Sequence, residues 1–299
     1  MRLRASDAAA GFMILTIASG KGGTGKTTVA VNLARVAESP VMLLDCDVEE
    51  PNAHLFLAPT LTATLPVFKP IPRVDAAKCA LCGKCAEVCA YHAIAVLPKA
   101  VFVCDSLCHG CGGCARFCPE RAITEEGHQV GVVEIGQSGG IAFAQGRLNV
   151  GEAMAGPVIR AVKHQIPPQG LAILDAPPGA SCSVVGTLRQ SDACVLVTEP
   201  TPFGLHDLRL AIEVARRMGI PHGVVINRDG EGDSGVEAYC QTERIPMLMR
   251  LPADRRIAEA YSRGEMAVDA LPEYRPAFQA LLNACRALAQ EGREACKNL

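Results

Sequence analysis

The chain has 299 residues, of which 49% are apolar and 20% are charged, and its formal net charge is −2. This length accommodates one large domain and a small one, and the apolar fraction is sufficient for a sizeable core. Because 29 basic residues are balanced by 31 acidic ones, there is no electrostatic reason to expect nucleic acid or an anionic membrane as the main partner.

The cysteine content restricts the class of protein further. Fifteen cysteines either form disulfides outside the cell or hold metal inside it. Residues 1–12 lack the long apolar segment of an export signal, and there is no run of roughly 18 apolar residues that could span a membrane. We therefore expect a cytoplasmic protein, without stable membrane insertion, whose cysteines are metal ligands. Residues 1–12 are expected to be a disordered leader, with Met1 or Met13 as the start.

The first elements alternate between strand and helix. Residues 13–19 are an apolar run of strand type, Lys26–Glu38 has the apolar spacing of a helix, and Val41–Leu44 is a second apolar run. This βαβ opening predicts an α/β fold in which a mostly parallel sheet has helices on both faces.

The pattern then changes. Residues 66–72 predict a proline-rich linker, residues 73–124 are dense in cysteine and internally repeated, and Gly136–Gly151 predicts loops. Beyond them the α/β pattern resumes, so one domain (13–72 and 125–299) is interrupted by a small α+β insert (73–124). Helices are expected at Glu152–His164, Leu205–Met218, Arg256–Arg263 and Ala277–Glu291, and strands at Leu171–Leu174, Ala193–Thr198 and Gly223–Ile226.

A phosphate-binding loop follows the first strand. Gly20–Thr27 satisfies G-x-x-x-x-G-K-[ST] and lies between a strand and a helix, the context that distinguishes this motif from an ordinary glycine-rich turn. Its backbone N–H groups and the helix N-terminus would face the phosphates. Lys26 would reach the β- and γ-phosphates, and Thr27 would ligate Mg²⁺. The predicted nucleotide-binding residues of this loop are Gly20, Lys21, Gly22, Gly23, Thr24, Gly25, Lys26, Thr27 and Thr28.

The second lysine of this loop adds information. With Lys21 in place, GKGGTGKTT resembles the deviant Walker A loop of the MinD/ParA superfamily, which includes the nitrogenase iron protein and the Mrp-type cluster carriers. The resemblance implies ATP or ADP with Mg²⁺, and a homodimer, or a heterodimer with a paralogous ATPase, in which Lys21 reaches the partner's nucleotide. An exposed loop lysine is the alternative.

Further segments match this superfamily in order. Asp45-Cys46-Asp47 looks like switch I, which implies that Asp47 orients the attacking water and that Asp45 supports Mg²⁺ through water. Leu171–Asp175 and the following Ala176–Gly179 look like Walker B and switch II, which implies that Asp175 holds the Mg²⁺ shell. Two positions that resemble the adenine contacts are Asn227 and Pro252. The catalytic residues implied are Lys21, Lys26, Asp47 and Asp175, and we expect slow, dimer-activated hydrolysis.

The cysteines of the insert form two identical runs. Cys79, Cys82, Cys85 and Cys89 are spaced C-x₂-C-x₂-C-x₃-C, and Cys108, Cys111, Cys114 and Cys118 repeat that spacing. This is the run of bacterial two-cluster ferredoxins, in which the fourth cysteine ligates the other cluster. Zinc, which usually takes two separate pairs, is the alternative. The predicted [4Fe–4S] ligands are Cys79, Cys82, Cys85 and Cys118 for one cluster, and Cys108, Cys111, Cys114 and Cys89 for the other.

Together the two motif sets resemble the branch of MinD-superfamily ATPases that carries an inserted ferredoxin domain. Cys182 lies seven residues after Asp175, at the position where the nitrogenase iron protein has a cluster ligand, so an interfacial redox or metal role stands against a plain loop cysteine. Residues 125–174 contain no second cysteine for such a shared site.

Three functions are compatible with these motifs. The first is ATP-gated electron transfer, or nucleotide-switched docking of an unidentified redox protein. The second is an iron–sulfur or metallocentre assembly factor. The third is a MinD-like complex-organising ATPase with redox-sensing clusters. We favour the first, because redox clusters and a switch ATPase share one chain.

Overall fold

Seven consecutive strands, from the edge strand β11 to β7, run parallel in a nine-stranded sheet ordered β11-β10-β9-β1-β8-β2-β7-β6-β3. The structure, a computed structural model, describes residues 12–297 apart from residue 39. The parallel strands are β1 (Met13–Ala18), β2 (Val41–Asp45), β7 (Ile141–Leu148), β8 (Leu171–Asp175), β9 (Ala193–Thr198), β10 (His222–Asp229) and β11 (Met247–Pro252). The predicted mostly parallel α/β sheet is confirmed.

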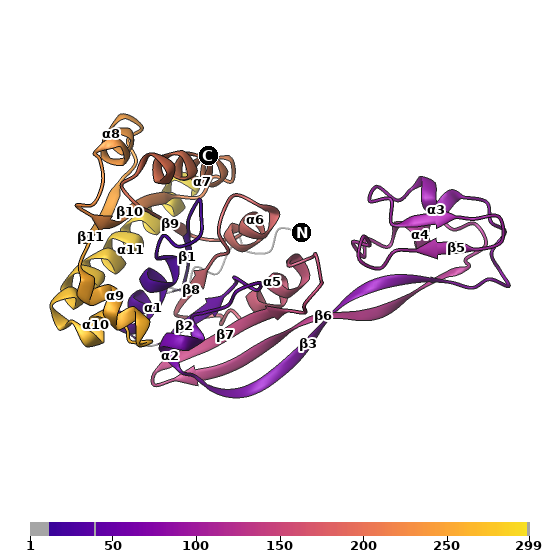
Figure 1. Ribbon diagram of the computed structural model, residues 1–299, viewed down its shortest axis with the longest axis horizontal. Helices are drawn as coiled ribbons and strands as arrows, with labels where there is room; N and C mark the ends of the chain where they lie inside the picture. Colours follow the sequence, from indigo (N-terminus) through magenta and orange to yellow (C-terminus); the bar gives the residue numbers. More distant parts are fainter. Residues whose placement is uncertain (1–11, 39, 298–299) are drawn as a thin grey trace.

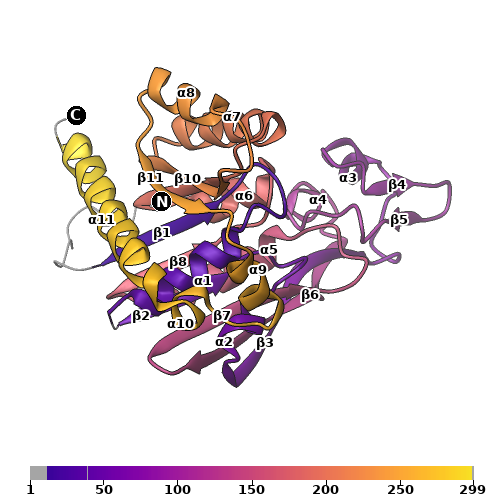
Figure 2. The same cartoon turned by 60° about the vertical axis from the view of Figure 1, so that its left-hand side comes forward.

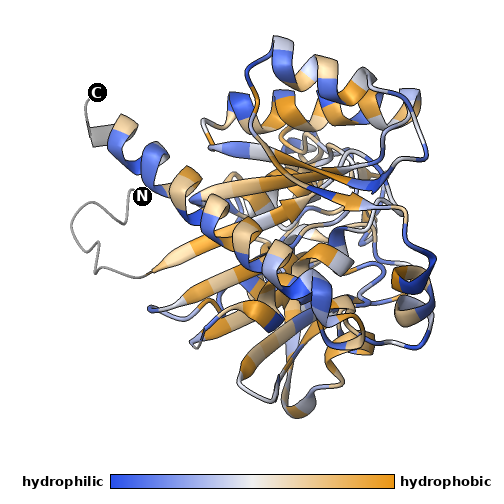
Figure 3. Cartoon of the chain, turned by 90° about the vertical axis from the view of Figure 1, so that its left-hand side faces the viewer, coloured by the Kyte–Doolittle hydropathy of each residue, from blue (hydrophilic) through white to orange (hydrophobic). Residues whose placement is uncertain are grey.

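Helices cover both faces of this sheet (Figure 1). Leu43 of β2 packs in the same cluster as Leu33 of α1 (Lys26–Val36) and Phe278 of α11 (Arg275–Lys297), whereas the next residue, Leu44, packs with Ile159 of α5 (Gly156–Lys163) on the other face. Figure 3 shows α11 crossing in front of hydrophobic strands. The other helices are α2 (His54–Leu57), α3 (Lys84–Glu87), α4 (Gly113–Arg116), α6 (Cys182–Leu188), α7 (Pro202–Arg217), α8 (Gly235–Thr242), α9 (Arg255–Ser262), α10 (Ala267–Ala270) and a 3₁₀ turn at Pro272–Tyr274.

A long antiparallel ribbon leaves one edge of the sheet. It consists of β3 (Thr60–Val74) and β6 (Ile123–Ser138), paired from Thr60 beside Gln137 to Val74 beside Ile123. Residues 75–122 form a small lobe at its far end, with a two-stranded sheet of β4 (Ile94–Val96) and β5 (Val101–Val103). In both Figure 1 and Figure 2 the lobe lies on the side of the molecule away from α11.

The ribbon corrects two expectations. Residues 66–72 are part of β3 and not a linker, because their prolines lie in an edge strand, where a missing N–H group is tolerated. Gly136–Gly151 is not mainly loop, since it contains the end of β6, the turn at Gly139 and the whole of β7.

The structure also differs from the prediction at Phe12 and at the start of one helix. Residues 1–11 of the expected leader lie outside the described residues, but Phe12 packs partly against the core and its carbonyl accepts a hydrogen bond of 2.5 Å from Arg293 Nη2. The helix expected from Glu152 begins at Gly156, with Pro157 in its first turn. No helix among residues 12–38 and 40–297 is long and apolar enough to cross a membrane.

Candidate functional site: a phosphate loop, two buried carboxylates and a cysteine lobe

The phosphate loop joins β1 to α1. Gly23 and Gly25 have φ of 77° and 92°, in the left-handed region that favours glycine. A Cβ atom on Gly25 would lie 2.4 Å from Asn227 Nδ2, so Gly25 also permits a close contact. The same amide nitrogen donates a hydrogen bond of 2.9 Å to the carbonyl of Thr24. Asn227, near the end of β10, therefore supports the phosphate loop directly. Its contact with adenine remains a prediction.

Two carboxylates lie side by side behind this loop. Asp45 and Asp175 are register partners at the carboxyl ends of β2 and β8, and they are 0% and 1% exposed. Asp175 Oδ2 accepts a hydrogen bond of 2.5 Å from Thr27 Oγ1. Its other oxygen, Oδ1, has no hydrogen-bond partner among the described residues. The ends of β2 and β8 thus place Asp45 beside Asp175, and the start of α1 adds Thr27, so that oxygen ligands of the kind that Mg²⁺ prefers lie near one another.

Burial dominates the electrostatics of these carboxylates. It raises the pKa of Asp45 to about 6, opposed by N–H donors such as that of Ala53 and by the charge of Lys26. It also raises the pKa of Asp175 well above its usual value, and the charge of Asp45 acts in the same direction. A bound cation would offset this cost, because it favours the charged form of both groups.

Asp45 also organises the loop that follows β2. Its Oδ1 accepts from the N–H of Asp47, and its Oδ2 accepts from the N–H groups of Asn52 and Ala53, all at 3.0 Å. Asp47 itself is only partly buried, and burial followed by the charge of Asp45 raises its pKa to about 6. The loop from Asp47 to Ala53 is therefore folded around the carboxylate of Asp45.

A cavity of about 670 Å³ opens beside the phosphate loop, within the usual size range of small-molecule sites. Its lining includes the predicted residues Gly23, Gly25, Lys26, Thr27, Thr28, Asn227 and Pro252. It also includes Arg228, Arg255 and Tyr261, which follow no motif and were not predicted. Lys21 does not line this cavity. Its Nζ forms an ion pair of 2.9 Å with Glu199, another residue that was not predicted.

The two cysteine runs occupy equivalent places in the lobe. The N–H of Asp75 donates to the carbonyl of Ala122 at 2.8 Å, and the N–H of Cys104, 29 positions later, donates to Ala93 at 2.7 Å. The φ angles repeat as well, with 79° at Gly83 and 74° at Gly112. The sequence repeat is therefore also a repeat of backbone structure.

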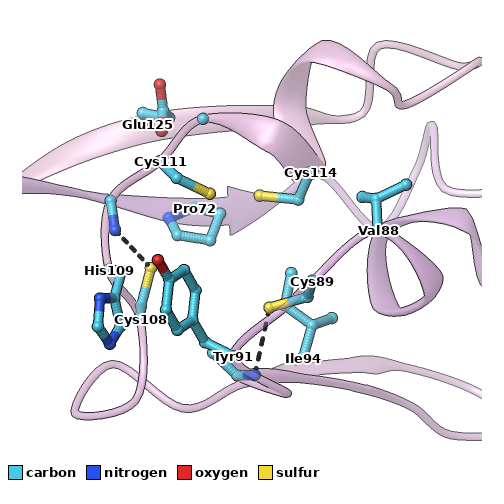
Figure 4. Close-up of a pocket in the computed structure, with 13 residues that line it drawn as sticks. Pro72, Val88, Cys89, Tyr91, Ile94, Cys108, His109, Cys111, Cys114 and Glu125 are labelled. Carbon is cyan, nitrogen blue, oxygen red and sulfur yellow. Dashed lines mark hydrogen bonds between the residues drawn. The ribbon is translucent and has the colours of Figure 1, made fainter.

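The thiols of the runs surround two cavities. One cavity is lined by Cys79, Cys82, Cys85 and Cys118, and the other by Cys89, Cys108, Cys111 and Cys114. Figure 4 shows the four sulfurs of the second set directed toward a common space, with Tyr91 stacked on His109 at a ring distance of 3.5 Å beside it. Each set takes three cysteines from one run and one from the other. These thiols and the other described cysteines form no disulfides.

Cys182 lies apart from both sets. It is exposed at the first position of α6, close after the end of β8. No group of three or more His, Cys, Asp or Glu side chains within residues 12–38 and 40–297 is arranged to hold a single metal ion, at Cys182 or elsewhere. A redox or metal role for Cys182 remains a prediction.

Comparisons with known proteins agree on the larger domain. A family model described as the CobQ/CobB/MinD/ParA nucleotide binding domain matches residues 15–268. An uncharacterized protein of Methanocaldococcus jannaschii, MJ0579, is 30% identical over 263 residues, covering 85% of this chain and 91% of that protein. The cell division ATPase MinD of Pyrococcus furiosus matches with a TM-score of 0.56 and 22% identity, over 92% of this chain and 99% of that one. The septum site-determining protein MinD of Pyrococcus horikoshii, complexed with Mg-ADP, matches with a TM-score of 0.54 and 21% identity, over 94% and 95%.

Proposed function

The chain belongs to the CobQ/CobB/MinD/ParA family of nucleotide-binding domains, and from that premise we propose that it is an Mg²⁺-dependent ATPase whose nucleotide state gates a redox lobe. In this proposal the lobe holds two [4Fe–4S] clusters, and ATP controls electron transfer or the docking of a redox protein partner. The observation that carries the proposal is the ribbon, which joins two four-cysteine cavities to the loop after Asp45.

The nucleotide half rests on the charges around the phosphate loop. Lys26, at the start of α1, would bind the β- and γ-phosphates, and Thr27 with Asp175 would hold Mg²⁺. The unpartnered Oδ1 of Asp175 suits such an ion. Bound Mg²⁺ would offset the negative charge of the phosphates. Asp45 would support the ion through water, and Asp47 would orient the attacking water.

The cluster half rests on the arrangement of the thiols. A single zinc ion requires sulfurs at about 2.3 Å from one point, and the described thiols do not gather in that way. Four thiols spread around a cavity suit a larger polynuclear group, and the three-plus-one division matches two-cluster ferredoxins. When bound, such clusters supply one-electron oxidation and reduction.

The chain contributes hydrogen bonds to these thiols. The N–H groups of Ala93 and Ala122 donate to Cys89 Sγ and Cys118 Sγ, both at 3.3 Å. Donation to sulfur stabilises the thiolate and tunes the group that it binds. The equal distances in the two repeats support equivalent ligand roles for these two cysteines.

The link between the two halves is short and continuous. Asp45 accepts hydrogen bonds from Asn52 and Ala53, α2 follows directly, and β3 begins at Thr60. Ser138 Oγ, at the end of β6, donates to the carbonyl of Leu57 at the end of α2. A shift of the loop around Asp45 upon nucleotide binding would therefore move the base of both ribbon strands.

Association of two chains is part of the proposal. A phosphate-loop lysine that is not directed into its own cavity, as Lys21 is not, suits contact with the nucleotide of a second subunit. The partner would be a second copy of this chain or a paralogous ATPase.

The proposal predicts nucleotide-dependent redox behaviour. The protein would be purified without oxygen, its iron counted, and the dithionite-reduced form mixed with a one-electron acceptor protein, with and without MgATP. We expect a different rate of oxidation with MgATP, and no difference in an Asp175→Asn variant with the same iron content. Equal rates with and without MgATP in the unsubstituted protein would reject gating. Transfer of clusters to an apo-protein would instead favour an assembly factor, and redox-dependent oligomerisation would favour a complex-organising ATPase.

A further inference from the structure

Glu199 joins two cations beside the phosphate loop. It directly follows β9, and its side chain is 11% exposed. Its Oε2 lies 2.9 Å from Lys21 Nζ, and its Oε1 lies 2.7 Å from Arg228 Nη1. Each carboxylate oxygen therefore has its own cation.

The two cations differ in what they do for this carboxylate. Lys21 comes from the phosphate loop and retains a third of its side-chain exposure, so it can leave toward another molecule. Arg228 lies on β10 and lines the cavity beside the phosphate loop, and its main chain has a φ of 56°. If Lys21 leaves, Arg228 still balances the buried carboxylate, whereas a buried charge without any partner would strongly oppose release.

We propose that Glu199 is a positioning residue that holds Lys21 on its own chain until the nucleotide of a second subunit competes for it. The inference rests on the proposed nucleotide-dependent dimer. A triphosphate carries more negative charge than a diphosphate, so it competes better with one carboxylate for the ammonium group. Glu199 thereby makes association selective for ATP over ADP, and Arg228 keeps the release reversible.

Two substitutions should act in opposite directions. Glu199→Gln removes the charge that holds Lys21 and retains the size of the side chain. We expect MgATP-dependent association at a protein concentration roughly three- to tenfold lower, and detectable association with MgADP. Arg228→Gln leaves Lys21 as the partner of Glu199, so association with MgATP should require a higher concentration. Sedimentation velocity measures both, with nucleotide affinity determined on the same samples, because Arg228 lines the cavity.

The double variant separates this role from a general structural one. In a Lys21→Ala background, Glu199→Gln should have no further effect on association. If Glu199→Gln leaves association unchanged or weakens it, the inference is wrong even though ATP-dependent association exists.

Failure of the dimer itself gives a different result. If the unsubstituted protein never associates with MgATP, the proposed dimer is wrong, and the contact is then judged by amine labelling of Lys21 in the nucleotide-free protein. Mass spectrometry should find faster labelling of Lys21 in Glu199→Gln than in the unsubstituted chain, with exposed Lys99 as the internal reference. Equal labelling of Lys21 in the two proteins would contradict a holding role for Glu199.

Discussion

Replacing Lys69 with methionine should loosen the lobe from the ATPase domain. Lys69 lies on β3 and its side chain is 2% exposed. Its Nζ donates a hydrogen bond of 3.1 Å to the carbonyl of Asp105 in the lobe and forms an ion pair of 3.2 Å with Glu152, which precedes α5. Three parts of the chain therefore meet at one buried ammonium group. His128 Nε2 on β6 lies 2.5 Å from the other oxygen of Glu152.

The size of the effect follows from these contacts. Removing one member of a buried ion pair costs about 3–5 kcal/mol of unfolding free energy, because the remaining charge is left unpaired. Methionine keeps most of the side-chain length, and His128 remains beside Glu152, so we expect the lower end, about 3 kcal/mol. For a domain of this size, that corresponds to a fall in Tm of roughly 6–12 °C.

Thermal unfolding of the anaerobic protein, followed by circular dichroism, measures this change. The matched control is Lys99→Met, at an exposed lysine of the lobe, which should change stability by less than about 0.5 kcal/mol. Adding Glu152→Gln to Lys69→Met removes the unpaired charge and should restore part of the lost stability. A Tm of Lys69→Met equal to that of the control, or a further fall in the double variant, would refute the reasoning.

Three other outcomes are expected. Gly25→Ala should abolish nucleotide binding, measured by calorimetry, because the added Cβ would lie 2.4 Å from the amide nitrogen of Asn227, at a φ of 92°. Gly22→Ala is the control and should retain binding, because there is open space around Gly22. Equal losses of nucleotide affinity in the two variants would contradict this reasoning. Cys89→Ser should lower the iron content of the anaerobic protein, whereas Cys104→Ser, in the same lobe but outside both cavities, should not; equal iron would argue against these ligand sets. Burial raises the folded-state pKa of Asp45 to about 6, above its usual 3.8. Between these two pH values the native protein therefore binds more protons than the unfolded chain, so the free energy of unfolding should fall as the pH rises from about 4 to 6. The affinity for Mg²⁺-nucleotide should rise over the same pH interval, because the charged form of Asp45 favours the cation. The absence of both trends in denaturation and binding experiments would contradict the burial of Asp45.

The sequence predicts the parallel strands better than the ribbon. The strands β1, β2, β8 and β9 are buried on both faces, so they appear as predominantly apolar runs. The ribbon strands β3 and β6 contain prolines, glycines and charged residues, and they are stabilised by pairing between distant positions such as Thr60 and Gln137. Local pattern does not reveal such pairing, and for this reason residues 66–72, with their prolines, have the sequence pattern of a linker although they belong to β3.

The residues of the site also differ in how far the sequence predicts them. Asp45 and Asp175 end apolar strands, and parallel strands bring their carboxyl ends to one edge, so their proximity could be predicted. Glu199 also follows a strand end, a signal that could have identified it. Its contact with Lys21 nevertheless joins residues 178 positions apart, and no local motif specifies which cation it meets. Tyr261 and Arg255 reach the cavity from α9, whose place depends on the packing of the whole domain.

The most direct test of coupling between the two halves is spectroscopic. Electron paramagnetic resonance of the anaerobic, dithionite-reduced protein would be recorded with and without MgATP, beside an Asp175→Asn variant. We predict the signals of two interacting [4Fe–4S]⁺ clusters that change with MgATP in the unsubstituted protein only. Cluster signals that are indifferent to MgATP would contradict a nucleotide-gated redox lobe, and the absence of any cluster signal from protein folded and purified without oxygen would contradict the assignment of the cysteines.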